Sequence, residues 1–236
     1  MGRVATLLPG LHQIKLKASS AYLLEIGSEL TLVDCGMPGD GVRIVEAVSK
    51  LGRKPSDITR IVVTHAHADH FGGLAEVKAA TGAEAWMHPL DADIVRNGHP
   101  IRESRPAPGL PGLLFPLLKG MFRMGGLPPV PVEHEVGDGE ELPGGLRVIG
   151  VPGASAGQIA LLWGRVLIAG DALCTAPGFG GHQFGYEDGA KAEQSKQRLA
   201  ALDVDSFVVG HGKPVIGDAG RWLRQRYGRS TTAEVG

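Results

Sequence analysis

The sequence feature that most constrains this chain is a cluster of three histidines and a carboxylate directly after an apolar run. Residues 61–63 are Ile-Val-Val, typical of a buried strand, and they lead into His65, His67, Asp69 and His70. In an extended backbone, side chains two residues apart point to the same side, so His65 and His67 face one way. The chain then tightens into a predicted helix, which aims Asp69 and His70 at a second point nearby. Imidazoles and a carboxylate are ligands that a zinc-like cation prefers, so the spacing favours a metal site over a merely polar loop.

Composition and charge narrow the class of protein. The chain has 236 residues, 43% of them apolar and 21% charged, which suits one soluble domain spanning residues 1–236. The net charge of −1 gives no electrostatic footprint for nucleic acid. No apolar run is long enough for a membrane span, and no secretory signal is visible. Cys35 and Cys174 are too few for a disulfide framework. We therefore expect a cytoplasmic protein with a small-molecule substrate, binding neither nucleic acid nor membrane.

Strand and helix patterns alternate along both halves of the chain. The predicted strands are 21–26, 30–34, 61–63, 84–87, 146–151, 159–163, 166–169 and 206–209, and the predicted helices are 41–51, 73–80 and 189–202. This order indicates α/β layering. In each half a strand leads into a residue that can bind metal: His65 in the first, Asp171 and His211 in the second. The pattern suggests a sandwich with its site between two sheets.

A proline-rich, apolar insertion at about residues 91–135 separates the halves. Prolines concentrate between residues 100 and 131, and at this density they are expected to break regular elements. Long insertions in compact domains often form lids or binding loops. Two roles stay open: an apolar flap that covers the core or forms a homodimer contact, and a lid that faces the substrate.

Taken together, the motifs resemble the metallo-β-lactamase superfamily over about residues 4–216. The matching segments are Ala21-Tyr22-Leu23-Leu24, Leu32-Val33-Asp34-Cys35-Gly36, Thr64-His65 through Asp69-His70, Val151-Pro152-Gly153, Ala169-Gly170-Asp171 and Gly210-His211-Gly212. The resemblance implies a four-layer αβ/βα sandwich with a metal site, usually a binuclear zinc site, at one edge.

The resemblance also implies a role for each site residue. His65 and His67 would bind the first metal, and Asp171 would bridge to the second. The second metal would be bound by Asp69, His70 and His211, and Asp34 would hold a ligand in place from behind.

One position departs from the family pattern. Where the family usually has Pro-Gly-His, this chain has Pro152-Gly153-Ala154, so the third imidazole of the first metal site is missing. The amide of Gln158 is a poor substitute on zinc, and no spacing supports His182 as a replacement. We expect one well-held metal and one weak or absent metal, with Fe or Mn as alternatives to Zn²⁺. Because the other six ligand positions are intact, a single recent or deliberate His-to-Ala change is favoured over natural adaptation to one metal, which stays open.

The reaction class implied is metal-dependent hydrolysis by a metal-bound hydroxide, most simply of an ester, lactone or thioester. Asp69 would orient the water and accept its proton, and turnover is expected to be very low while Ala154 replaces the histidine. A persulfide dioxygenase-like enzyme with one iron, and a non-catalytic binding protein on the same fold, are the alternatives. Cys174 either faces the site or is a small buried residue, and His182, in a glycine-rich loop, is a candidate substrate contact.

Overall fold

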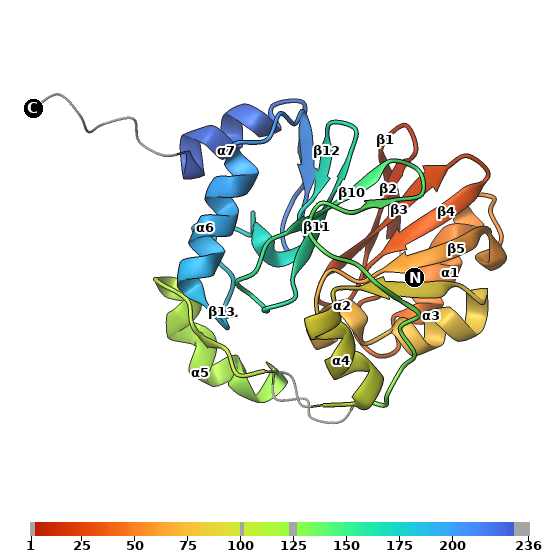
Figure 1. Ribbon diagram of the computed structural model, residues 1–236, viewed down its shortest axis with the longest axis horizontal. Coiled ribbons are helices and arrows are strands. Elements are labelled where there is room, and N and C mark those ends of the chain that lie inside the picture. Colours follow the sequence, from red (N-terminus) through yellow and green to blue (C-terminus); the bar gives the residue numbers. More distant parts are fainter. Residues whose placement is uncertain (1–2, 100–101, 123–126, 229–236) are drawn as a thin grey trace, which may run out of the picture.

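Two β-sheets lie face to face with helices on both outer sides (Figure 1). The structure is a computed structural model that describes residues 3–99, 102–122 and 127–228. The first sheet has the order β1-β2-β3-β4-β5-β6-β8, with bounds β1 (Arg3–Leu8), β2 (Leu11–Lys15), β3 (Ser20–Ile26), β4 (Glu29–Val33), β5 (Ile58–Val62), β6 (Glu84–Met87) and β8 (His134–Glu135). The second has the order β15-β14-β12-β11-β10-β9, with bounds β15 (Val215–Ile216), β14 (Ser206–Val208), β12 (Val166–Ile168), β11 (Ile159–Trp163), β10 (Leu146–Gly150) and β9 (Glu141–Leu142).

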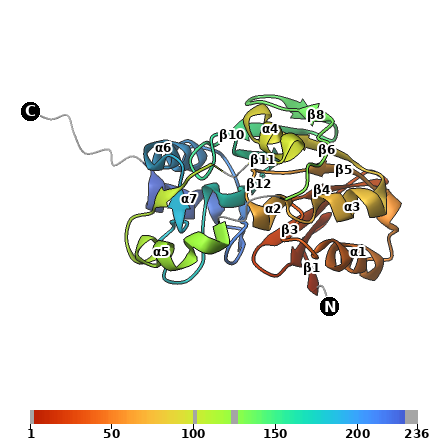
Figure 2. The ribbon, with the colours of Figure 1, turned by 90° about the horizontal axis from the view of Figure 1, so that it is seen from below.

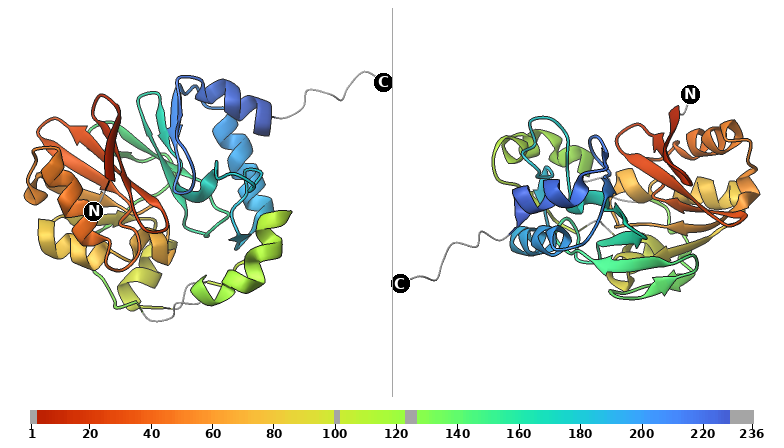
Figure 3. Two further views of the ribbon diagram at one scale, coloured as in Figure 1. Left: turned by 180° about the vertical axis from the view of Figure 1, so that it is seen from behind. Right: turned by 90° about the horizontal axis from the view of Figure 1, so that it is seen from above.

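Helices cover the outer face of each sheet, as the views in Figures 2 and 3 show. The first sheet carries α1 (Gly41–Lys50), α3 (Leu74–Thr81) and α4 (Pro89–Asn97), with the short α2 (Ala68–Phe71) at its edge. The second sheet carries α6 (Gly189–Ala200) and α7 (Ala219–Tyr227). A two-stranded sheet of β7 (Arg105–Pro106) and β13 (Gly185–Tyr186) and a helix α5 (Leu110–Phe122) complete the fold. Two 3-10 turns, η1 (Pro55–Asp57) and η2 (Gly170–Ala172), are also present.

The alternation of side chains along each strand produces three apolar layers. On β3, Ala21 and Leu23 pack toward the helices of the first sheet, whereas Tyr22 and Leu24 pack between the two sheets. Because neighbouring residues of a strand point to opposite faces, a strand buried on both faces must be apolar throughout. The expected four-layer αβ/βα sandwich, the metallo-β-lactamase fold, is what the structure shows.

The insertion contains a helix that the prolines were expected to prevent. That expectation was wrong for residues 110–122, which form α5. Pro111 lies in the first turn, where a backbone N–H has no helical partner, and a single interior proline, Pro116, removes one further hydrogen bond. Phe115 packs against the backbone of Gly185, where a Cβ would lie 2.6 Å from its ring, and anchors α5 to β13. Lid and dimer contact both stay predictions for this segment.

None of the helices within the described ranges combines the length and the apolar character that crossing a membrane requires.

Candidate metal centre

The predicted ligands converge because each follows the end of a strand on one edge of the sandwich. His65 and His67 lie in the loop after β5, and α2 begins directly afterwards and carries Asp69 and His70. Asp171 lies in η2 after β12, and the remaining ligand, His211, follows the neighbouring parallel strand β14. Their side chains form two groups, each with ligand atoms within 4.8 Å of one another.

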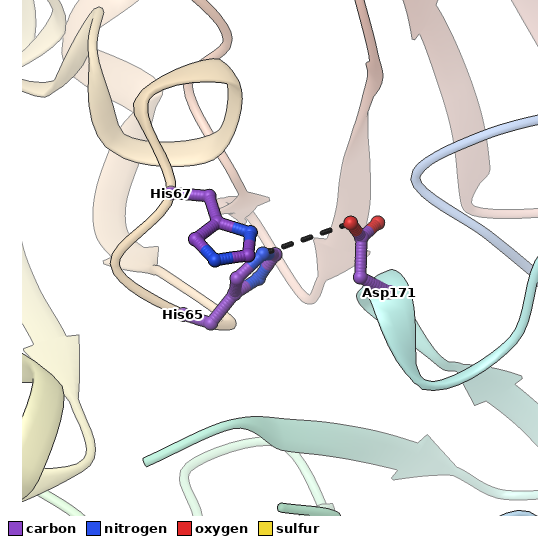
Figure 4. Close-up of side chains that lie close together, drawn as sticks. All are labelled: His65, His67 and Asp171. Carbon is purple, nitrogen blue, oxygen red and sulfur yellow. Dashed lines mark ion pairs between the residues drawn. The ribbon is translucent and has the colours of Figure 1, made fainter. Parts of the chain in front are cut away.

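The first group consists of His65, His67 and Asp171 (Figure 4). His65 Nε2 lies 3.7 Å from Asp171 Oδ2, and the two imidazole centroids are 4.5 Å apart with an interplanar angle of 73°. All three residues are buried. The two histidines come from one loop and the carboxylate from the opposite sheet, so this group spans the two halves.

The second group consists of Asp69, His70 and His211. Asp69 Oδ2 lies 3.1 Å from His211 Nε2 and 3.8 Å from His70 Nε2. Asp171 also reaches this group, with Oδ1 at 3.2 Å from His70 Nε2 and Oδ2 at 3.4 Å from His211 Nε2. The carboxylate of Asp171 therefore lies between the two groups, where a bridging ligand would be placed.

Unpartnered polar atoms show that these residues fit a cation. Among the described residues, His65 Nε2, His70 Nε2 and Asp171 Oδ1 are buried and have no hydrogen-bond partner. A buried polar atom without a hydrogen-bond partner destabilises the folded protein, and three such atoms in one cluster indicate that a ligand binds there. Nitrogen and carboxylate donors in this number suit zinc or a similar divalent cation.

Charges within the cluster shift its pKa values in opposite directions. Burial and the neighbouring imidazoles lower the pKa of His65 well below its usual value. Burial opposes charge on His211, but the carboxylates of Asp171 and Asp69 outweigh it and raise the pKa to about 10. Burial likewise opposes ionisation of Asp171, but His211 and His70 hold its pKa well below the usual range. Without a cation, protonated imidazoles of the second group offset the negative charge of the carboxylates.

Asp34 lies behind the second group and forms a hydrogen bond with His70. Its Oδ2 accepts a hydrogen bond from His70 Nδ1 at 2.8 Å, which leaves Nε2 of that ring to face the site. Its Oδ1 accepts from the backbone N–H of Thr64 at 2.8 Å. The backbone of Asp34 adopts φ +64°, a conformation that residues other than glycine rarely take, and these hydrogen bonds hold it there.

Ala154 brings no donor to the first group. It is 2% exposed and packs with Ala107, Tyr186 and Ala192. Gln158 uses its Oε1 to accept the backbone N–H of Ala154 at 3.3 Å, and it belongs to neither group.

Two other candidate residues lie outside both groups. His182 Nδ1 is 3.2 Å from Lys196 Nζ. Cys174 is 1% exposed, and burial raises the pKa of its thiol to about 11, which fits an unreactive small buried residue. Cys174 borders a cavity of about 570 Å³ that Lys213 and Arg226 also line.

Asp91 is a site residue that the sequence analysis missed. Fully buried at the start of α4, it accepts hydrogen bonds from Ala66 N at 2.8 Å, Ser155 Oγ at 2.5 Å and Gly157 N at 3.0 Å, and it pairs with Arg102. It therefore fixes the loop between the two histidines of the first group to the loop that contains the missing ligand position. An acidic residue in a first helical turn is common, so no local signal distinguished it.

Sequence comparisons agree with this geometry. A family model described as the metallo-beta-lactamase superfamily matches residues 14–211. The probable metallo-hydrolase YflN of Bacillus subtilis is 27% identical, over 88% of this chain and 86% of its own. A hydroxyacylglutathione hydrolase of Anaeromyxobacter dehalogenans is 31% identical, over 79% of this chain and 58% of its own.

Solved structures share the fold. A variant metallo-beta-lactamase from Cronobacter sakazakii superimposes with a TM-score of 0.72, at 21% identity, over 95% of this chain and 93% of its own. The enzyme BJP-1 of Bradyrhizobium japonicum gives a TM-score of 0.68, at 22% identity, over 94% of this chain and 90% of its own. With the family match over residues 14–211, the two ligand groups and this fold, the chain belongs to the metallo-beta-lactamase superfamily of metallo-hydrolases.

Proposed function

We propose that this chain is a metal-dependent hydrolase of thioesters or related esters, with one complete metal group and one incomplete one. The observation that carries the proposal is the carboxylate of Asp171 between the two groups, with unpartnered nitrogens of His65 and His70 on either side. Such a cluster is costly to keep buried unless a cation binds there. Zn²⁺ suits the donors best, and Fe or Mn would be accepted by the same residues.

Two observations support an acyl substrate. The relative from Anaeromyxobacter dehalogenans is named for the hydrolysis of a glutathione thioester. On α5, Leu110 and Leu113 are 56% and 74% exposed, and Phe115 joins this helix to β13, which carries Tyr186 beside Ala154. An apolar helix that is joined in this way to the strand beside Ala154 is suited to contact an acyl chain. A contact with a second copy in a homodimer is the other use of the same surface.

The chemistry is divided between the cation and the chain. When bound, divalent cations lower the pKa of water toward about 7 and polarise a carbonyl oxygen. We assign to Asp69 the role of orienting the attacking water and accepting its proton, because its half-buried carboxylate lies beside both imidazoles of the second group. His70 and His211 bind and orient, with Asp34 fixing the ring of His70.

The first group is expected to bind its metal more weakly than the second. It has two imidazoles and the shared carboxylate, and Ala154 supplies a methyl group where a third nitrogen would stand. Loss of a residue that only supports a ligand already costs about 10–100-fold in metal affinity, so loss of a ligand costs more. We therefore propose one tightly bound and one weakly bound cation.

Elemental analysis and hydrolysis assays of this chain beside Ala154→His test the proposal. We expect one zinc per chain here and two in Ala154→His, with faster hydrolysis of thioesters such as S-lactoylglutathione. Ala156→His is the matched control, because it adds an imidazole two residues away at a half-buried position. It should leave the metal content at one.

Other outcomes would contradict the proposal. Two zinc ions in both proteins would mean that another residue completes the first group. Bound metal without hydrolysis in either protein would favour a non-catalytic binding protein. Oxygen-dependent oxidation of glutathione persulfide by the iron-loaded chain would favour a mononuclear dioxygenase.

A further inference from the structure

A buried lysine outside the metal groups has no role in the proposed chemistry. Lys196, on the inner side of α6, is 1% exposed. Its ammonium lies 5.3 Å and 5.6 Å from the ring centroids of Tyr186 and Tyr227, and 3.6 Å from Glu193 Oε2. Lysine is almost never fully buried without a partner, because its charge loses hydration. Burial lowers the pKa of Lys196, and the Glu193 carboxylate opposes this shift. The aromatic faces also favour the charged form, in which the group is an ammonium.

The hydrogen bond made by this ammonium determines the state of His182. Lys196 Nζ lies 3.2 Å from His182 Nδ1. An ammonium group can only donate, so Nδ1 must offer a lone pair and the ring proton must lie on Nε2. The imidazole is neutral, since burial and the Lys196 charge both lower its pKa.

His182 belongs to a segment that lies against the metal centre. Its neighbour Gln183 donates from Nε2 to the backbone oxygen of Asp171 at 3.1 Å. Tyr186, whose hydroxyl is 3.5 Å from His182 Nδ1, belongs to the same small apolar cluster as Ala154. No described residue forms a hydrogen bond with His182 Nε2, and the ring is partly exposed. The Nε2–H is therefore available to a ligand, on a segment whose next residue, Gln183, contacts Asp171.

We propose that Lys196 is a positioning residue that fixes His182 as an Nε2–H donor for an oxygen of the bound substrate. The oxygen is that of a carbonyl or a carboxylate, since either accepts one N–H. This proposal rests on the proposed hydrolase function for its substrate class, but the state of the ring is a property of the protein alone.

Long-range ¹H–¹⁵N NMR of the zinc-loaded full chain, labelled at histidine, tests the assignment directly. The His182 signals are identified as those absent from His182→Gln. We expect a protonated Nε2 and an unprotonated, hydrogen-bonded Nδ1. In Lys196→Met, a replacement of similar volume that suits a buried site, the Nδ1 resonance should move, and in Lys196→Arg, which keeps a donor, it should move less. Lys191→Met, on the exposed face of α6, should leave it unchanged.

Two NMR results would overturn the proposal: a proton on Nδ1 in the unmodified chain, or an Nδ1 resonance that is the same in Lys196→Met. A chain that hydrolyses no substrate would contradict the proposed function instead, and the NMR result would still decide the state of His182.

Kinetics of Lys196→Met and His182→Gln complete the test. Each should raise KM for a thioester about three- to tenfold, the effect of one hydrogen bond, and the double variant should be no worse than His182→Gln alone. Additive losses would show that the two residues act separately and would contradict the proposal.

Discussion

The buried carboxylate of Asp91 gives the sharpest test of how the metal loops are held together. Asp91→Asn keeps the shape of the side chain but replaces one acceptor oxygen with an NH₂ donor. Each oxygen of Asp91 accepts from two groups, so the amide nitrogen must face two donors whichever way it is turned. If it faces Ala66 and Ser155, the hydroxyl of Ser155 can rotate and accept, but the backbone N–H of Ala66 loses its partner.

The structure allows the cost to be worked out. A buried N–H without an acceptor costs about 1–3 kcal/mol. The hydrogen bond from Arg102 also loses its charged acceptor. A hydrogen bond to a charged group contributes about 1.5–3 kcal/mol, and we take the lower value because a third of the Arg102 side chain is exposed. We expect Asp91→Asn to lower the free energy of unfolding of the metal-free protein by about 3 kcal/mol.

Urea denaturation of the metal-free protein measures this loss, and zinc titration measures the effect on the site. Zinc affinity should fall as well, because Ala66 stands between His65 and His67. Asp93→Asn is the matched control: Asp93 lies on the same helix with its side chain 64% exposed, and its loss should change stability by less than about 0.5 kcal/mol. A loss below about 1 kcal/mol in Asp91→Asn would refute the reasoning.

Three further predictions concern the metal centre. The metal-free protein at pH 7.5 should release protons when zinc binds to the second group, because the pKa of His211 is raised to about 10. Zinc binding to His65, whose pKa is lowered, should release no proton from that ring. Calorimetry in buffers of different ionisation enthalpy measures the number of protons released. In the same protein, the stability that comes from protonated His211 is present in full below pH 6.5 and is lost as the pH rises through about 10, so urea midpoints that are flat across this range would contradict the assignment. Gly210→Ala should abolish zinc binding, because its Cβ would lie 2.5 Å from Asp171 Oδ1, while Gly189→Ala, where a Cβ meets nothing within 4 Å, should bind zinc normally in the same elemental analysis.

Much of the layered fold could be predicted from local periodicity. The expected strand at 84–87 is β6, and the expected helices at 41–51 and 189–202 are α1 and α6 within two residues at each end. Strands of two residues, such as β7 and β13, were missed because their partner across the sheet, not their own sequence, makes them strands. α5 was missed because proline content was weighted above the position of each proline in the helix.

The candidate ligands were found because their spacing is local. His65, His67, Asp69 and His70 lie within six residues after one strand, and the geometry of a strand end is enough to gather them. Asp171 and His211 were marked as candidates because each follows a predicted strand, but their roles came from the family resemblance, since nothing in their own segments says which residues they meet. The structure now shows Asp171 between the two groups.

The sequence by itself determined the α/β layering, the metal-ligand pattern at one sheet edge and the absence of a nitrogen at position 154. Only the tertiary structure decided that Asp91 joins Ala66 to Ser155, across 25 and 64 residues, and that a buried lysine controls the ring of His182. The physical reason is that periodicity reports which face of an element is apolar. Burial and hydrogen-bond geometry depend on which elements meet, and that is fixed only when the two sheets pack.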